Sequence, residues 1–252
     1  MCSKRWGAIA WVLALAGATA LYAAPPPDAG DMLRAADASH HAFPEGVIRL
    51  RVVVDERGKK PLESLLELFV KGTDRSLAVI REGKQKGRKI LTVGDRVWLI
   101  VPGASHPIPV SKSQRLMGAA SFGDIARLRF AAEYEATLRP GEQPVARDGG
   151  ETPCRVLDLK AVRAGSAYPT AVLWTGRDDG LVRRLRLFLA SGKEAKDVLF
   201  TAYDEKSRIA TIEIRDLLVA DGKNLTALVF ESYEPRALDP GTFDPEGARA
   251  VP

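Results

Sequence analysis

Residues Gly94 to Leu138 read GDRVWLIVPGASHPIPVSKSQRLMGAASFGDIARLRFAAEYEATL, and this stretch decides how the rest of the chain is interpreted. Its first part, around Trp98, predicts a strand with apolar side chains on both faces. Glycine and proline residues within 103–109 then interrupt strand pairing. A weakly helical apolar piece follows at 113–118, and a second helix is predicted over 124–134, with an aspartate as its N-cap. A segment that leaves a sheet, crosses as short helices and returns to a strand is typical of a lid. An ordinary crossover within a packed core explains the same pattern, and the pattern alone favours that alternative.

Most of the remaining chain alternates apolar and polar residues with a period of two, which predicts strands. One series of strands runs from 46 to 93, and a second runs from 155 to 233. No helix-long pattern separates these strands, which argues against a parallel α/β sheet. A short helix is predicted at 28–42. The sequence therefore predicts a mainly β (α+β) protein with about ten or eleven antiparallel strands, and a twisted sheet of that size curls or closes.

Four short blocks at characteristic spacing carry a resemblance to a known family. They are Gly94–Trp98, Gln114–Gly118, Gly123–Ala126 and Glu133–Leu138. Together they resemble the LolA-like outer-membrane lipoprotein-sorting protein family, and the similarity extends from about Asp31 to about Tyr233. The resemblance implies a curled half-barrel whose mouth is covered by short helices, and a periplasmic carrier of acyl chains without catalytic apparatus. The link at 103–109 contains more proline than the family pattern. The resemblance therefore does not define the shape of the cavity mouth.

Residues 1–24 have the features of a secretory signal peptide: a basic start, an uncharged apolar run and small residues near its end. Cleavage is predicted after Ala20 or after Ala23. An uncleaved membrane anchor is the alternative, because the apolar run is near the short limit for a membrane span. The three prolines at 25–27 favour cleavage. The predicted location is the periplasm.

Cleavage changes the charge and the cysteine content of the mature chain. Loss of Lys4 and Arg5 reduces the 37 basic residues to 35 against 32 acidic residues, so the net charge becomes +3. This charge is too small to indicate nucleic-acid binding. Cys2 is lost as well, so Cys154 has no partner in the mature chain and is predicted to be a small buried hydrophobe beside Val156.

The chain lacks the sequence patterns of common catalytic and metal sites. No Gly-x-Ser-x-Gly motif and no glycine-rich phosphate loop is present. His40 and His41 are adjacent and point in different directions on a helix or strand, so they do not chelate one metal well. The sequence predicts no enzyme activity, no catalytic residue, no metal and no cofactor.

The function predicted on these grounds is a monomeric carrier of lipid or lipoprotein acyl chains, formed by one domain at 25–235 and followed by a surface tail at 236–252. Transfer of an acyl chain of ~15 methylenes out of water is favourable by ~12 kcal/mol of free energy. The free-energy cost of opening the lid must offset part of this if the chain is to be released. An inner-membrane transporter or permease would load the carrier, and an outer-membrane acceptor would receive the cargo. The alternative is a non-catalytic interaction or sensor module that partners an inner-membrane transporter. The predicted lipid-binding residues are Leu50, Val52, Leu66, Leu68, Leu99, Leu187 and Ile212, and the predicted lid residues are Leu116, Met117, Ile125 and Leu128.

Overall fold

The computed structural model describes residues 27–40, 44–56, 58–111, 113–121, 129–147, 150–219 and 224–252. The predicted signal peptide and the lid residues Ile125 and Leu128 lie outside the described residues.

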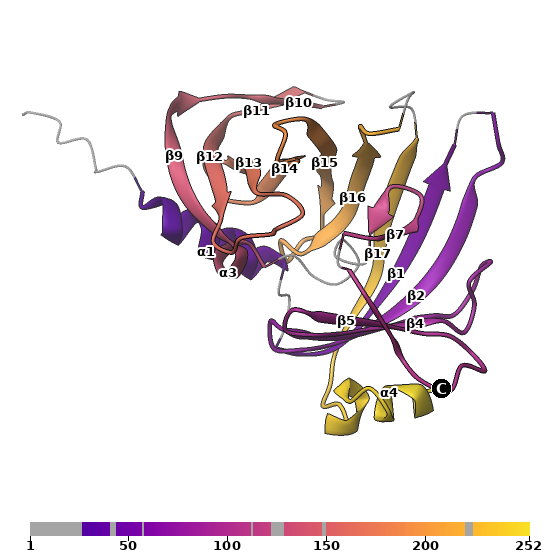
Figure 1. Cartoon of the computed structure of the whole chain (residues 1–252). Coiled ribbons are helices and arrows are strands. Elements are labelled where there is room, and N and C mark those ends of the chain that lie inside the picture. The colour runs from indigo at the N-terminus through magenta and orange to yellow at the C-terminus, as the bar shows by residue number, and fades with distance from the viewer. Residues whose placement is uncertain are drawn as a thin grey trace, which may run out of the picture.

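One curled antiparallel sheet of 13 strands dominates the described part of the chain (Figure 1). Its order is β6-β5-β4-β3-β2-β1-β17-β16-β15-β14-β13-β12-β9, so β6 and β9 form the two edges and the sheet does not close. The strands are β1 (Glu45–Asp55), β2 (Leu62–Lys71), β3 (Arg75–Ile80), β4 (Lys89–Val93), β5 (Arg96–Ile100), β6 (Ile108–Val110), β9 (Tyr134–Glu142), β12 (Cys154–Ala161), β13 (Thr170–Gly176), β14 (Val182–Phe188), β15 (Glu194–Tyr203), β16 (Ile209–Asp216) and β17 (Leu225–Pro235). The predicted fold class is confirmed, with more strands than the sequence indicated.

The alternation of side chains places a continuous apolar surface on the inner face of the curled sheet. Cross-strand register aligns these residues, as in the row Val52–Leu228–Ile212–Phe200 across β1, β17, β16 and β15. All four side chains are buried in the main hydrophobic cluster. Because each strand contributes every second residue to this face, the core of the protein lies inside the curve of the sheet.

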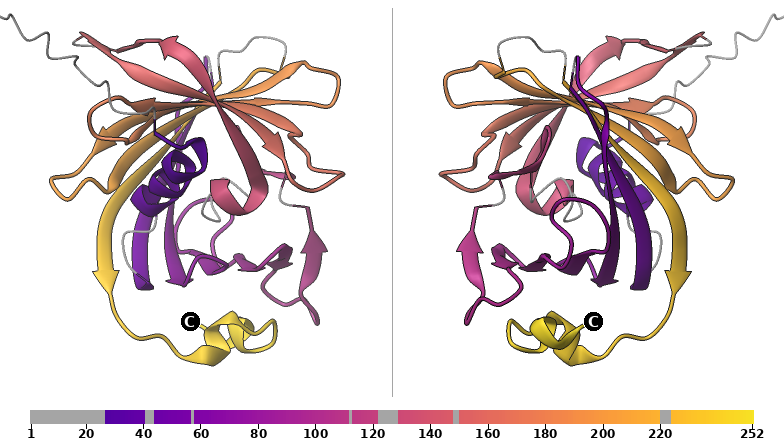
Figure 2. Two further views of the ribbon diagram at one scale, coloured as in Figure 1. Left: turned by 90° about the vertical axis from the view of Figure 1, so that its left-hand side faces the viewer. Right: turned by 90° about the vertical axis from the view of Figure 1, so that its right-hand side faces the viewer.

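Small separate elements lie on the inner face of the large sheet. They are α1 (Ala29–His40), α3 (Phe130–Glu133) and a hairpin formed by β7 (Arg115–Met117) and β8 (Ala120–Ser121). Figure 2 shows α1 within the curve of the sheet. The helix predicted at 28–42 is confirmed by α1, whose Leu33 and Ala36 are buried in the main cluster.

The segment at 113–118 corrects a prediction, because it contains a strand instead of a helix. Gly118 adopts a φ of 53°, in the left-handed region, and so reverses the chain between β7 and β8. Of the helix predicted over 124–134, residues 124–128 lie outside the described residues. The described part contains α3, which ends at Glu133, and Tyr134 begins β9. A second hairpin pairs β10 (Val145–Arg147) with β11 (Gly150–Thr152).

The segment predicted as a surface tail packs on the outer face through η1 (Pro240–Phe243) and α4 (Gly247–Ala250). Phe243 and Ala248 are buried there against strands β2 to β5. Lys89 Nζ on β4 donates to the carbonyl oxygens of Ala248 at 3.1 Å and Arg249 at 2.7 Å, and to that of Val251. Burial, with a smaller contribution from Arg81, lowers the pKa of the Lys89 ammonium.

Cys154 is fully buried in a third apolar cluster on the outer face, beside Val156 and Trp174. Its Sγ donates to the Thr152 carbonyl oxygen at 3.2 Å, and burial raises the pKa of the thiol. A buried, protonated thiol is a poor nucleophile. We therefore expect a thiol reagent to label Cys154 slowly without denaturant and rapidly in denaturant. Rapid labelling of the native protein, or a covalent dimer on a non-reducing gel, would contradict this expectation.

Candidate functional site

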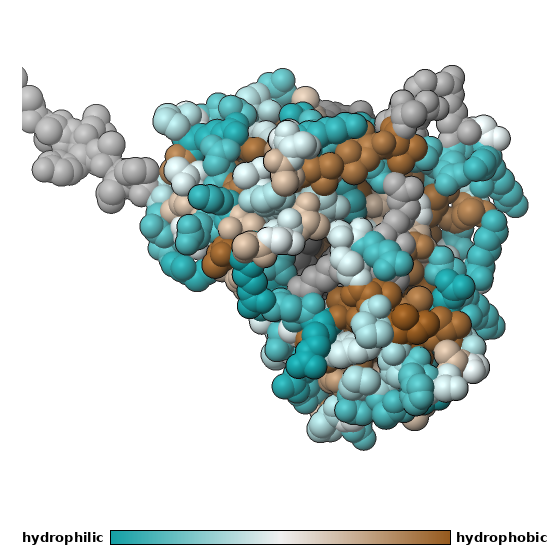
Figure 3. Space-filling view, in the orientation of Figure 1, coloured by the Kyte–Doolittle hydropathy of each residue, from teal (hydrophilic) through white to brown (hydrophobic). Residues whose placement is uncertain are grey.

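The inner face of the sheet and the elements that cover it form the candidate site. The covering elements contribute Phe130 from α3, Met117 from the hairpin, and Ala119 and Ala120 from its turn and second strand to the main cluster. In the space-filling view, apolar surface lies on both sides of a hollow over the inner side of the sheet (Figure 3). The inner face is therefore covered by several pieces that belong to different parts of the chain.

The structure places all seven predicted lipid-binding residues on the inner face. Six of them have side chains no more than 5% exposed and pack within the main cluster, whereas Leu99 is partly exposed. The six are Leu50, Val52, Leu66, Leu68, Leu187 and Ile212. Of the seven predicted residues, Leu99 is therefore the one that lies where the apolar face begins to open.

The row of side chains that contains Leu99 shows how the face opens toward edge strand β6. Across β4, β5 and β6 the row runs Ile90–Leu99–Ile108. Ile90 is 2% exposed, Leu99 is partly exposed and Ile108 is 46% exposed. The rim of the apolar face therefore lies at β5 and β6. Sequence analysis missed Ile108 because the prolines on either side of it suggested a break, although Ile108 and Val110 alternate as strand residues do.

The hairpin β7–β8 is held on the inner face by two polar contacts and by close packing. The Ala119 backbone N–H donates to Thr226 Oγ1 at 2.8 Å, and Gln85 Nε2 donates to the Leu116 carbonyl oxygen at 3.1 Å. Gly118 lies so close to β1 and β17 that a Cβ at this position would be 2.3 Å from Thr226 Oγ1 and 2.7 Å from Val54 Cγ1. Of the predicted lid residues in the described part, Met117 is buried and Leu116 is half-buried.

Asp37 connects α1 to the second covering helix. Its Oδ1 accepts from the backbone N–H of Phe130 at 2.6 Å, and its Oδ2 accepts from that of Ala131 at 2.8 Å. Burial raises the pKa of this carboxyl group, while the two backbone hydrogen bonds oppose that rise. The contact ties together segments separated by more than 90 residues, and nothing in the local sequence indicated it.

Aromatic residues lie at another part of the inner face. Phe230 and Tyr233 of β17 stack with ring centroids 6.1 Å apart, and the Arg208 guanidinium lies 4.5 Å from the Tyr233 centroid. The Tyr203 hydroxyl donates to the Val182 carbonyl oxygen at 2.5 Å. All three aromatic side chains are partly exposed and pack against the main cluster, so they extend the apolar face with amphipathic groups.

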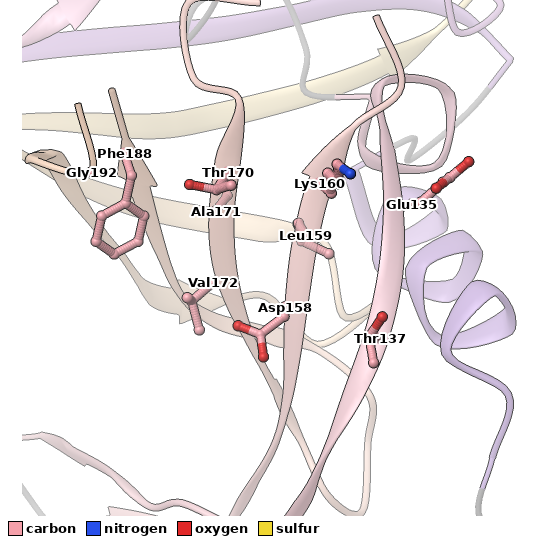
Figure 4. A pocket seen from close by; sticks show the side chains of 10 residues that line it. All are labelled: Glu135, Thr137, Asp158, Leu159, Lys160, Thr170, Ala171, Val172, Phe188 and Gly192. Atoms are coloured by element: carbon pink, nitrogen blue, oxygen red, sulfur yellow. The ribbon is translucent and has the colours of Figure 1, made fainter. Parts of the chain in front are cut away.

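A pocket of about 410 Å³ lies on the outer face, across β9, β12, β13 and β14 (Figure 4). Asp158 contributes to it and is held by Arg139, whose Nε donates to Asp158 Oδ2 at 2.7 Å. Lys160, Val172 and Phe188 also line it. This mixed polar and apolar pocket contains none of the predicted lipid-binding residues, so it is separate from the inner-face site.

Metal-binding clusters and membrane-spanning helices are both absent from the described residues. Within them, no three His, Cys, Asp or Glu residues gather in a way that could hold a metal ion. The helices they form are too short or too polar to span a bilayer.

A family model described as "Uncharacterized protein" matches residues 72–247, more than half of the chain. The chain belongs to this family. No curated protein matches the sequence of this family member.

Solved structures place the family member among LolA-like folds. A LolA superfamily protein from Nitrosomonas europaea superposes with a TM-score of 0.77 at 23% identity, over 88% of this chain and 99% of that one. A DUF1329 family protein from Desulfovibrio piger superposes with a TM-score of 0.72 at 20% identity, over 85% of this chain and 95% of that one. A putative outer membrane lipoprotein-sorting protein domain from Vibrio parahaemolyticus superposes with a TM-score of 0.72 at 13% identity, over 88% of this chain and 98% of that one. The resemblance to the LolA-like family is thus confirmed at the level of the fold.

Proposed function

We propose that this protein is a non-catalytic carrier that binds acyl chains of lipids or lipoproteins on the inner face of its sheet. The observation that carries the proposal is a continuous apolar face covered by separate small elements. Such elements can move without breaking strand pairing in the sheet. The likeness to a LolA superfamily protein and to a lipoprotein-sorting domain supports the same function.

Burial of an acyl chain against an apolar face is favourable. Each buried methylene contributes about 0.8 kcal/mol, so a chain of ~15 methylenes gains ~12 kcal/mol on leaving water. The contacts between Ala119 and Thr226 and between Gln85 and Leu116 hold the hairpin in place. Their loss on opening would offset part of this gain, because each such hydrogen bond contributes ~1 kcal/mol. This cost of opening would lower the affinity for the cargo and so favour its release.

The proposed setting is the periplasm, reached through the signal peptide predicted at 1–24. An inner-membrane transporter would load the carrier and an outer-membrane acceptor would unload it. The proposed working form is a monomer that uses no cofactor or metal.

We expect a Leu116→Gln substitution to weaken binding of a fluorescent fatty-acyl probe by about tenfold, because the half-buried Leu116 would contact the chain. Unfolding of the lipid-free protein should change little, since the Gln amide can still reach water. The measurements are a probe titration and denaturant unfolding of each variant. Val162→Gln is the matched control, because Val162 is 56% exposed and lies outside the apolar clusters.

Two outcomes would contradict the carrier proposal. One is the absence of saturable probe binding by the unsubstituted protein. The other is a stability loss of about 2–5 kcal/mol in Leu116→Gln without a change in probe affinity, as expected of an ordinary core residue. Either result would favour an interaction module with a permanently packed interior.

A further inference from the structure

Two oppositely charged side chains interrupt the apolar inner face. Lys196 of β15 lies opposite Asp216 of β16 in the strand register, and each residue is only 6% exposed. Two residues further along the same face, Val198 and Ile214 are also paired and belong to the main apolar cluster. The charged pair is therefore continuous with the surface proposed to bind acyl chains.

The register on the other side of β15 confirms this orientation. Lys196 also lies opposite Leu187 of β14, which is buried in the main cluster. A buried charge pair loses hydration, and an apolar pair of similar volume is often as stabilising or more so. Asp216 Oδ1 also accepts from the backbone N–H of Leu218 at 2.9 Å, so one carboxylate oxygen is used in the turn that follows β16.

Other polar groups gather around the pair. Lys196 Nζ lies 6.0 Å from the ring centroid of Tyr168, and the Tyr134 hydroxyl donates to the Tyr168 carbonyl oxygen at 3.0 Å. Burial raises the pKa of Tyr134 to about 12, so its hydroxyl remains a donor at neutral pH. On the neighbouring strand β17, the buried Thr226 hydroxyl holds the covering hairpin. Tyr134, Tyr168 and Thr226 thus add polar groups on the strands and loops near the charged pair.

We propose that Lys196 and Asp216 form a subsite for the polar head of a bound amphiphile, and that this head is zwitterionic. The inference rests on the proposed function, in which acyl chains occupy the inner face. Because the two charges lie opposite each other on neighbouring strands, the pair has no net charge. A ligand that matches it carries one charge of each sign, as a phosphate joined to an ammonium group does. The phosphate faces Lys196 and the ammonium faces Asp216.

Three single-chain probes with the same acyl group test this assignment. They are lysophosphatidylethanolamine, which is zwitterionic, lysophosphatidylglycerol, which is anionic, and monoacylglycerol, which is uncharged. The unsubstituted protein should bind the zwitterionic probe roughly tenfold more tightly than the uncharged one. Lys196→Met should weaken binding of both phosphate-bearing probes and leave the affinity for monoacylglycerol unchanged. Asp216→Asn should remove the preference for the zwitterionic probe over the anionic one.

A double variant is the control for misfolding, because each single substitution leaves one charge buried opposite a neutral side chain and could destabilise the fold. Lys196→Met combined with Asp216→Asn removes both charges, keeps a side-chain oxygen that accepts from the Leu218 backbone N–H, and should fold with an unchanged circular dichroism spectrum. This variant should bind all three probes alike. Equal affinities in the unsubstituted protein, or a head-group preference that survives in the double variant, would overturn the subsite. In those cases saturable binding of all three probes would leave the carrier proposal standing, whereas no binding of any probe would overturn the carrier itself.

Discussion

Replacement of Gly118 by alanine is expected to detach the hairpin β7–β8 from the inner face of the sheet. The glycine has a φ of 53°, which costs an L-residue roughly 1 kcal/mol. The added Cβ would also lie 2.3 Å from Thr226 Oγ1 and 2.7 Å from Val54 Cγ1. Both neighbours are buried in a packed core, so neither can move aside easily. We expect a combined penalty of about 3 kcal/mol, more than the ~1 kcal/mol that the hydrogen bond between Ala119 and Thr226 contributes.

Amide hydrogen exchange and probe release measure this effect. Residues 115–121 should lose protection while the strands β1 and β17 keep theirs, and a bound acyl probe should leave about tenfold faster. Gly94→Ala is the matched control, because Gly94 has a similar φ of 59° but nothing lies within 4 Å of its added Cβ. Equal behaviour of the two variants would mean that backbone strain, and not contact with Thr226, explains the result.

Leu66→Gln is expected to destabilise the lipid-free protein by about 3–5 kcal/mol, because it buries an amide and removes apolar packing. Leu66 is fully buried in β2, opposite Leu50 on one side and Ile80 on the other. The same substitution at Leu99, which is partly exposed, should cost only about 1 kcal/mol of stability but weaken binding of an acyl probe.

Denaturant unfolding and probe titration of both variants separate residues that build the sheet from residues that meet the ligand. If Leu66→Gln unfolds like the unsubstituted protein, the inner face is not a packed core at β2. If Leu99→Gln binds the probe normally, the rim at β5 and β6 takes no part in binding.

The inner apolar face was predictable because it depends on local alternation along each strand. Leu50, Val52, Leu66 and Leu68 follow a period of two, and the structure places all of them on one face. The helix at 28–42 was predictable for the same reason, since its apolar spacing is local. The short strand β6 was missed, because the prolines within it and before it masked an alternation of only three residues.

The candidate site was only partly predictable from the sequence. Leu116 and Met117, predicted to belong to a lid, lie in the hairpin on the inner face. The hairpin itself was not predicted, because the left-handed turn at Gly118 accompanies close contacts with β1 and β17. The charged pair Lys196 and Asp216 was missed as well. Each residue looks like a solvated strand position until the register shows which face it occupies.

The sequence by itself determined the antiparallel strands, the apolar inner face and the resemblance to LolA-like proteins, because these depend on residues close together in the chain. The tertiary structure alone decided which apolar side chains are covered and which lie at the rim. That distinction depends on contacts between distant segments, such as the bond from Ala119 to Thr226 across 107 residues and the bonds from Phe130 and Ala131 to Asp37. Such contacts form only when the curled sheet brings its inner face around the covering elements, and no local pattern encodes them.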